Sequence, residues 1–352
     1  MIYRLPKILG ISRWKCVTYS ELIDLQKCLL RGSAGRLLLS TPLPDPVPTR
    51  ATIVGTFHHQ AMEAAGLGLE PEQLEEKLEE MIVAAQSEAS ASRHLRRLGP
   101  VSNWDEINRS FTAAVRWSRR RREGKSFDIL RVEQPLTSSD GVLVGKPDRY
   151  AVSGDRAVLT EFKTSSLRDA EGNVRDEYLT QLSFYAALLI DNYPVKQVIA
   201  HLESTTGEEF SAAIGKDEAR QFATGVKDLL SDANQRIAIL RSALDLASPT
   251  PHACNYCSLR VLCSAFVSRQ NELSLDRAQA VLVATLKSRG VPDEGGLVAN
   301  LELDEGNRTV RLAVPGELAN DVQLQRRYAF ANLDIAGSAF RWTEMTQVFS
   351  VD

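Results

Sequence analysis

The sequence predicts a mixed α/β fold followed by a small all-β region at the C-terminal end. Three observations indicate this. Segments with helical spacing lie on both sides of residues 127–165; that stretch consists of short runs rich in Val, Ile and Leu; and the chain from residue 297 onward has strand spacing. Strands enclosed by helical segments predict a central mixed sheet flanked by helices.

The local patterns predict the elements in chain order. Helices are expected over residues 17–28, 55–66, 70–86, 104–124, 176–192 and 216–246, and strands over residues 127–136, 141–152, 156–165, 195–204 and 208–214. A polar helical stretch is expected after residue 263, then a hairpin over residues 297–314 and strands over residues 327–335 and 340–351. We therefore expect a helical insertion over about residues 70–125.

Length and composition bound the class of protein. With 352 residues, 43% hydrophobic and 25% charged, the chain fits an ordinary globular protein of about two domains. A net charge of −3 gives no overall positive field, so any surface for nucleic acid must be local. We find no secretory signal and no apolar run long enough to cross a membrane, so a cytoplasmic location is expected.

We expect a domain boundary near residue 275, which separates residues 1–274 from a β-rich domain over residues 275–352. The second domain is a candidate for a small barrel of the oligonucleotide-binding (OB) type. Its strands carry five aromatic residues, Tyr328, Phe330, Phe340, Trp342 and Phe349. Such rings either stack on single-stranded bases or fill the core, and the second role is the commoner one in strands.

The stretch "AVLTEFKTSS" places two opposite charges on one side of a predicted strand. Glu161 and Lys163 are two residues apart, so their side chains share a face, whereas Phe162 points the other way. A tight reversal at "VSGD" would bring Asp148 of "GKPDRY" beside Glu161. Two carboxylates and a lysine suit a hard cation such as Mg²⁺ and phosphodiester hydrolysis. The competing interpretation is an exposed Glu–Lys ion pair of little energetic consequence.

The motifs "GKPDRY", "EFK" and "QLSFY" together resemble the RecB-like branch of the PD-(D/E)XK nuclease superfamily. The family also has an upstream helix of the "GTFxHxxxE" type, matched here by "GTFHHQAME", and a glutamate before the core, matched by Glu133. The resemblance implies a restriction-endonuclease-like core with Mg²⁺ or Mn²⁺ held by His59, Asp148 and Glu161. His58 is the alternative imidazole if the match slips by one residue.

The same resemblance assigns roles to three further residues. Lys163 would be the catalytic lysine, and Gln181 and Tyr185, four residues apart on one helical face, would line the site. A DNA nuclease is implied, with a preference for exonuclease action on single-stranded ends, in DNA repair, recombination or defence. No nucleotide-binding motif is found, so a helicase working with this chain would be a separate protein.

Three cysteines form a tight cluster, C-x2-C-x5-C, at Cys254, Cys257 and Cys263. In a cytosolic protein such a cluster indicates a metal site, and Cys28 is the candidate for the fourth ligand. RecB-like nucleases with a [4Fe-4S] cluster, such as the AddB nuclease domain and the CRISPR-associated adaptation exonucleases, have one N-terminal and three C-terminal cysteines. The resemblance, over residues 17–266, therefore implies that cluster; zinc is the alternative.

Two rival functions follow from the same residues. The chain is either a nuclease or a nucleic-acid-binding scaffold that keeps the fold and an iron–sulfur or zinc site, does not cut, and works with a partner helicase or nuclease. A third interpretation is a zinc-stapled interaction protein. The presence of every catalytic position of the family pattern favours the nuclease.

Overall fold

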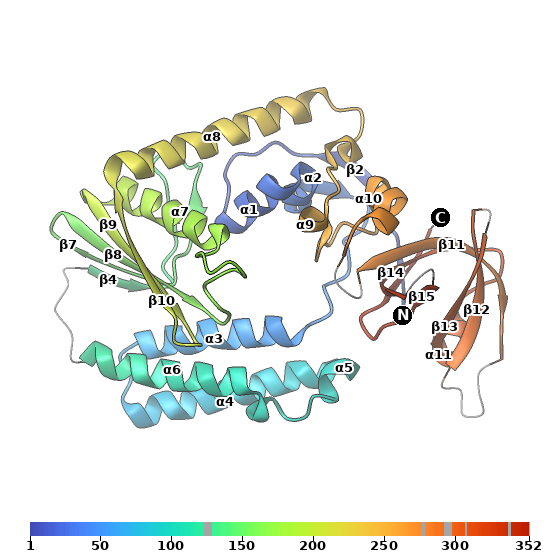
Figure 1. Ribbon diagram of the computed structural model, residues 1–352, viewed down its shortest axis with the longest axis horizontal. Coiled ribbons are helices and arrows are strands. Elements are labelled where there is room, and N and C mark those ends of the chain that lie inside the picture. Colours follow the sequence, from blue (N-terminus) through green and yellow to red (C-terminus); the bar gives the residue numbers. More distant parts are fainter. Residues whose placement is uncertain (123–128, 276–278, 292–297, 307, 337–338, 352) are drawn as a thin grey trace. The chain divides into compact units, whose positions relative to one another are not determined.

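In the computed structural model the described residues are 1–122, 129–275, 279–291, 298–306, 308–336 and 339–351 (Figure 1). The chain forms two compact units. We call residues 14–20 and 48–232 the central unit, and residues 1–13, 21–47 and 233–352 the terminal unit. The expected boundary after residue 274 lies inside the terminal unit.

A five-stranded mixed sheet forms the middle of the central unit. Its strands, in spatial order, are β10 (Glu209–Gly215), β9 (Gln197–Ser204), β8 (Arg156–Lys163), β7 (Arg149–Ser153) and β4 (Ile129–Val132). β8 and β9 are parallel and the other neighbours are antiparallel. A short ribbon pairs β5 (Leu136–Thr137) with β6 (Val144–Gly145). The mixed sheet is thus confirmed, although the strands predicted over residues 127–136 and 141–152 are each divided in two, and residues 127 and 128 lie outside the described residues.

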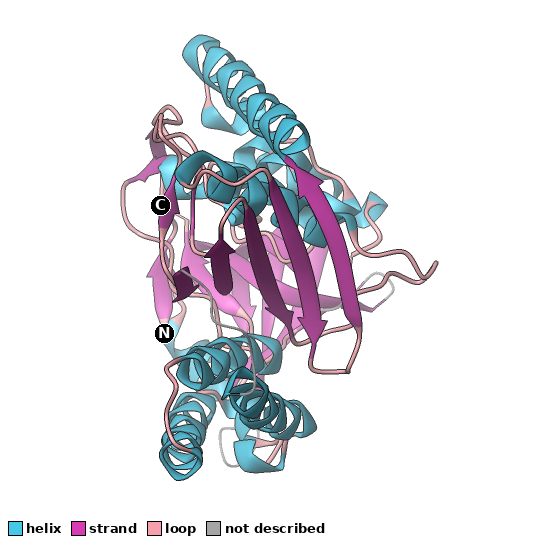
Figure 2. Cartoon of the chain, turned by 90° about the vertical axis from the view of Figure 1, so that its left-hand side faces the viewer, coloured by secondary structure: helices cyan, strands magenta, loops and turns pink. Residues whose placement is uncertain are grey.

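Helices cover both faces of this sheet (Figure 2). They are α3 (Arg50–Gly66), α4 (Pro71–Ala91), α5 (Arg93–Arg96), the 3-10 turn η2 (Val101–Asn103), α6 (Asp105–Arg122), α7 (Asp176–Asn192) and α8 (Lys216–Ile239). On one face Phe162 of β8 packs into a core shared with α3, α4 and α6. On the other, α7 packs against β8 and β9. Alternation along β8 therefore turns Phe162 and Glu161 to opposite sides.

The terminal unit combines both ends of the chain. Its first part contains β1 (Ile2–Arg4), β2 (Ile8–Ile11), α1 (Tyr19–Lys27, whose first two residues belong to the central unit), α2 (Leu29–Gly32), η1 (Ala34–Arg36) and β3 (Leu37–Leu39). After α8 come η3 (Ala243–Leu246), α9 (Pro251–Cys254), α10 (Ser264–Arg269) and η4 (Gln270–Glu272). β2 and β3 form a ribbon of their own.

A β sheet completes the terminal unit. It contains β11 (Ala280–Arg289), β12 (Val298–Glu305), β13 (Arg308–Pro315), β14 (Arg327–Ala336), β15 (Ala339–Arg341) and β16 (Gln347–Ser350), with the short helix α11 (Gly316–Asp321). The strand order is β1-β16-β14-β11-β12-β13, and β15 pairs with β14. β1 joins the edge parallel to β16. The predicted hairpin over residues 297–314 is confirmed as β12 and β13.

The sequence prediction for the terminal unit was wrong at β11, where a polar helical stretch was expected. β11 begins with a nearly continuous buried run, including Ala280, Val281 and Leu282. Such a run lacks the alternation of a half-exposed strand, so periodicity cannot distinguish it from a buried helix. The last predicted strand is also divided into β15 and β16, because hydrogen bonds between Thr343 and Thr346 form a turn between them.

The aromatic residues of this sheet fill its core. Tyr328, Phe330, Phe340 and Phe349 are all at most 6% exposed, and Trp342 packs against the same cluster. Of the two roles considered for these rings, packing in the core is therefore confirmed rather than stacking on bases.

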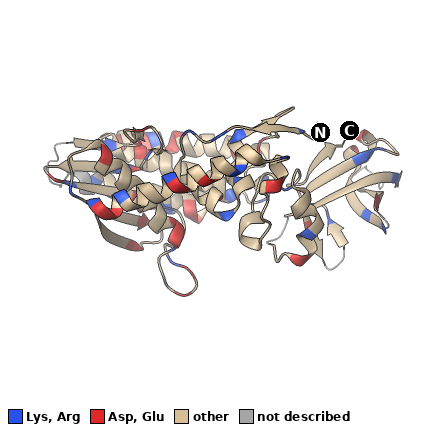
Figure 3. Ribbon diagram, turned by 90° about the horizontal axis from the view of Figure 1, so that it is seen from above, with Lys and Arg blue, Asp and Glu red and all other residues tan. Residues whose placement is uncertain are grey.

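Acidic and basic residues are interspersed along the described chain (Figure 3). This agrees with the small net charge of −3. Among the described residues, no helix has both the length and the apolar content needed to cross a bilayer.

Candidate active site

The hairpin of β7 and β8 places the two carboxylates side by side. Arg149 pairs with Thr160, so Asp148, one residue earlier, lies opposite Glu161. Both carboxylates are buried, with Asp148 7% and Glu161 1% exposed. The reversal predicted at "VSGD" is therefore confirmed, and it brings together two acidic groups that are 13 residues apart in sequence.

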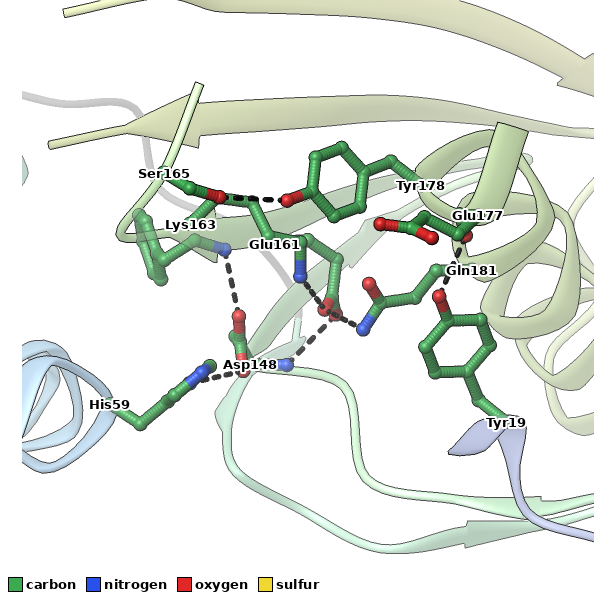
Figure 4. A network of polar contacts seen from close by, with 10 residues as sticks. Tyr19, His59, Asp148, Glu161, Lys163, Ser165, Glu177, Tyr178 and Gln181 are labelled. Carbon is green, nitrogen blue, oxygen red and sulfur yellow. Dashed lines mark hydrogen bonds and ion pairs between the residues drawn. The ribbon is translucent and has the colours of Figure 1, made fainter. Parts of the chain in front are cut away.

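Each carboxylate is fixed by the backbone next to the other (Figure 4). The Asp148 amide donates to Glu161 Oε1 at 3.1 Å, and the Phe162 amide donates to Asp148 Oδ2 at 2.7 Å. Backbone donors hold the acids in place without neutralising them. The arrangement fixes the spacing of two negative charges in an interior site.

A third and a fourth group approach Asp148 from other elements. His59 of α3 lies with Nδ1 3.1 Å from Asp148 Oδ1. Glu133 directly follows β4 with φ of 50°, a conformation that non-glycine residues rarely adopt. One ligand atom each from His59, Glu133 and Asp148 lie within 4.8 Å of one another. An imidazole nitrogen and carboxylate oxygens are donors that suit Mg²⁺ or Mn²⁺, so these residues fit a divalent cation.

Burial and mutual repulsion shift the ionisation of this cluster. Burial raises the pKa of Glu161 well above its usual value, and the charge of Asp148 raises it further. Burial also acts to raise the pKa of Asp148, but the hydrogen bond with His59 and the charges of His59 and Lys163 lower it. The hydrogen bond with Asp148 raises the pKa of His59. A cation among these groups would relieve the repulsion between the acids.

Lys163 reaches the same space from the end of β8. Its Nζ lies 3.7 Å from Glu161 Oε2, and its side chain is 13% exposed. The ring of Tyr178 on α7 lies 5.3 Å from Nζ in a cation–π contact. The hydroxyl groups of Tyr178 and Ser165 are 3.0 Å apart, which fixes the ring (Figure 4). Lys163 is thus held at the edge of the carboxylate pair.

Helix α7 covers the Glu161 side of the site. Gln181 donates from Nε2 to Glu161 Oε2 at 2.6 Å and is 8% exposed. Tyr185, one turn later, is buried at 7% exposure. Burial raises the pKa of Tyr185, the charge of Glu161 adds to this, and a hydrogen bond with Gln181 opposes it. Gln181 thus orients Glu161, and Tyr185 lies one turn further along the same helix.

Of the three metal ligands expected from the sequence, His59 and Asp148 belong to the set that converges within 4.8 Å, whereas Glu161 lies beside Asp148 and Glu133 completes that set. His58, the alternative imidazole, is 2% exposed and lies edge-on to Phe162 at 6.2 Å, on the far side of β8. Sequence reasoning gave no site role to Tyr178 or Lys146, which is ion-paired with Glu133. Their signals were present: Tyr178 lies three residues before Gln181 on one helical face, and Lys146 lies within "GKPD".

Gly145 sets how closely the "GKPD" segment approaches α7. A Cβ atom at this position would lie 2.7 Å from Tyr185 Cε1 and 3.2 Å from Phe184 Cε1. We expect Gly145→Ala to destabilise the protein by about 1–3 kcal/mol, because the buried rings must shift. Denaturant unfolding would measure the change. Gly55→Ala on α3, where nothing lies within 4 Å of the new Cβ, is the matched control and should be neutral or stabilising. Equal stability of the two variants would contradict the prediction.

The raised pKa of Glu161 predicts how the metal-free protein depends on pH. Because the folded carboxyl binds its proton more tightly than the unfolded one, this group favours folding below its unfolded pKa. That contribution is lost as pH rises through the raised folded pKa. Glu161→Gln removes the titrating group. Between about pH 5 and about pH 9, the chelator-treated variant should therefore lose less stability than the chelator-treated wild type.

Thermal unfolding across this pH series would measure the effect. Glu171→Gln, at an exposed position, serves as the control and should follow the wild type. If the melting temperatures of wild type and Glu161→Gln changed in parallel with pH, the raised pKa of Glu161 would be ruled out. Added Mg²⁺ should raise the melting temperature of the wild type much more than that of the Gln variant.

A second candidate site lies in the terminal unit, where four cysteines line one cavity. They are Cys28, Cys254, Cys257 and Cys263. Cys28 immediately precedes α2, Cys254 ends α9, and Cys263 immediately precedes α10. The Ser248 amide lies 3.4 Å from the Cys28 sulfur. Folding therefore brings together an N-terminal cysteine and three that lie more than 220 residues later.

All four cysteines are free thiols. Four cysteine sulfurs around one cavity suit either an iron–sulfur cluster or a zinc ion. Burial raises the pKa of Cys263 to about 11 and also raises the pKa of Cys254 and Cys257.

The sheet, the paired carboxylates and the adjacent lysine define an α/β protein with a candidate site for a divalent cation. Residues 17–264 match the family model of the PD-(D/E)XK nuclease superfamily, and the chain belongs to this superfamily. The match covers the central unit and extends through the four cysteines.

Two solved structures show a weaker likeness. SSO0001 is 16% identical, with 62% of this chain and 98% of that chain covered at a TM-score of 0.28. A "Putative exonuclease" from Eubacterium rectale is 10% identical, with 71% and 93% covered at a TM-score of 0.35. At these low scores neither structure informs the function. No curated protein matches the chain.

Proposed function

We propose that the protein is a Mg²⁺- or Mn²⁺-dependent deoxyribonuclease that hydrolyses phosphodiester bonds, with exonuclease action on single-stranded DNA ends. The observation that carries this proposal is the convergence of His59, Glu133 and Asp148 within 4.8 Å, beside the buried Glu161. Membership in the superfamily supports the hydrolase class. A cytoplasmic location and a role in DNA repair, recombination or defence belong to the same proposal.

Each side chain of the site has a separate role in this proposal. His59, Asp148 and Glu161, with Glu133 as an addition, would hold the cation, which supplies polarisation of a phosphoryl oxygen and a lowered pKa of bound water. Lys163 orients the attacking water and offsets charge that develops on the phosphate. Gln181 keeps Glu161 in position through its 2.6 Å hydrogen bond. Tyr178 confines the Lys163 ammonium from the other side.

The cysteine site belongs to the proposal as a [4Fe-4S] centre held by Cys28, Cys254, Cys257 and Cys263. In support, one N-terminal and three C-terminal cysteines line one cavity, which provides the four sulfur ligands that such a cluster needs. The centre would cross-link segments that are far apart in sequence. We also propose that residues 1–274 and 275–352 are separate evolutionary domains, and that any helicase partner is a separate chain.

The test is digestion of matched substrates by the anaerobically purified protein. End-labelled linear single strands, linear duplexes, circular single strands and single-stranded RNA would each be incubated with Mg²⁺, Mn²⁺ or chelator. We expect metal-dependent loss of linear single-stranded DNA and survival of circles. Cleaved circles would instead identify an endonuclease, and equal cutting of RNA would contradict the DNA preference. No cutting by the fully loaded protein would favour the non-cutting scaffold.

A further inference from the structure

Arg260, in the terminal unit, is a buried cation for which the described residues provide no acidic partner. It is 7% exposed, and its Nε has no hydrogen-bond partner. Nη1 donates to the Cys254 carbonyl at 3.1 Å, and Nη2 donates to Asn332 Oδ1 at 2.8 Å. Neither acceptor is charged. A buried charge is costly unless an opposite charge compensates it, so the protein alone does not account for Arg260.

The cysteine cavity supplies the missing negative charge. Arg31 and Arg260 line it together with the four cysteines. Arg31 already has a carboxylate partner, since its Nε lies 2.7 Å from Asp24 Oδ1. Metal-bound cysteines are thiolates. If the cysteines hold a metal–sulfur centre, as proposed above, its negative charge is therefore the natural counter-ion for Arg260.

The other end of Arg260 contacts a β-bulge. The pairing of β11 with β14 shifts register between Ala280, opposite Leu333, and Val281, opposite Ala331. Asn332 is the extra residue and has φ of 63°. A bulge re-aims a side chain, and asparagine tolerates this conformation better than most residues. The bulge thus allows the Asn332 side chain to meet Arg260.

Asn332 also organises the sheet around it. Its Nδ2 donates to the Met345 carbonyl at 3.1 Å, and its own carbonyl accepts from Thr343 Oγ1 at 2.8 Å. It therefore holds the turn that precedes β16. Asn332 thus links the Arg260 guanidinium, which lies beside the cysteines, to the turn between β15 and β16.

A second contact joins the cysteine loop to the same sheet. The amide of Tyr256, between Cys254 and Cys257, donates to Gln279 Oε1 at 2.9 Å. Gln279 is 5% exposed and directly precedes β11. The cysteine loop is therefore joined to the residue before β11 directly and to β14 through Arg260, and β11 and β14 are neighbours in the sheet.

We infer that Arg260 is the counter-ion of an anionic metal–thiolate centre and that, through Asn332, loading of this centre orders the C-terminal sheet. With the centre in place, its negative charge compensates the positive charge of the guanidinium. The two Nη groups then stay bound to the Cys254 carbonyl and the Asn332 side chain. Without it, the buried charge is uncompensated and the link to β14 weakens. Coupling of this kind is reciprocal, so loss of the Asn332 contact also loosens the centre.

Hydrogen exchange on the full-length protein tests the coupling. Visible absorbance and iron and sulfide content first establish that the centre is bound. Amide exchange in β14 and β11 is then compared between loaded and chelator-stripped protein. We expect exchange there to become at least about tenfold faster on stripping, consistent with the loss of a hydrogen bond to a charged group.

Three variants separate charge from geometry. Arg260→Gln should lose iron to a chelator about 10- to 100-fold faster. Arg260→Lys keeps the charge and should retain most of the centre, with fast exchange in β14 because the fork is lost. Asn332→Gly, which suits the positive φ, should give fast β14 exchange in loaded protein. Arg269→Gln, at an exposed arginine paired with Glu272, is the control and should match wild type.

The outcomes distinguish this inference from the proposal on which it rests. If the purified wild type holds no metal at the cysteines, the proposed centre is wrong and the inference is overturned with it. If the centre is bound but β14 exchanges equally fast with and without it, the coupling is overturned and the centre stands. If Arg260→Gln retains iron as well as wild type, the counter-ion role is overturned.

Discussion

Lys163→Ala is expected to slow DNA cleavage by about 10²- to 10⁴-fold while DNA binding is retained. Nζ of Lys163 lies 3.7 Å from Glu161, at the edge of the proposed metal site, where an attacking water must be oriented. The ammonium lies outside the hydrophobic core that Phe162 enters from the other face of β8. Folding should therefore change little.

Cleavage rates and DNA-binding affinity would be measured separately for this variant. Lys196→Ala, a lysine that is 78% exposed and paired with Asp155, is the matched control and should cut like the wild type. Lys163→Arg keeps the charge with a different geometry, so it should restore little of the rate. Wild-type cutting by Lys163→Ala would show that Glu161 and Lys163 form a mere ion pair. Lost binding would instead identify Lys163 as a DNA-binding residue.

Cys254→Ser is expected to cause the largest loss of stability among these variants, because it removes a ligand from the proposed centre that would join Cys28 to the C-terminal cysteines. Binding of a structural metal contributes directly to the free energy of folding, and the effect can reach about 10 kcal/mol. The variant should lose visible absorbance, bind less iron, and melt at a much lower temperature or fail to fold. Circular dichroism with iron and sulfide analysis would measure this.

Cys16→Ser is the control for the cysteine prediction, since Cys16 lies outside the four-cysteine cavity. It should leave iron content and melting temperature unchanged. An unchanged melting temperature in Cys254→Ser would contradict a structural centre. A colourless wild type with one zinc per chain would replace the iron–sulfur assignment by zinc.

Much of the central unit was predictable because its signals are local. The strands β7 and β8 are short apolar runs around a turn, and antiparallel pairing then requires Asp148 and Glu161 to face each other. Gln181 and Tyr185 were assigned from the resemblance of "QLSFY" to the family motif, and their four-residue spacing places them on one face of α7. The strand β11 was missed because a run buried on both faces has no diagnostic period.

The sequence by itself determined which chemical groups are available: two carboxylates, a lysine and an imidazole with regular local spacing, and four cysteines near the ends of the matched region. Only the tertiary structure decided which of them meet. Contacts such as Glu133 with His59 and Asp148, Tyr178 with Lys163, and Arg260 with the bulged Asn332 join different elements. These contacts depend on packing and strand register rather than on any local pattern, so spacing along the chain does not encode them.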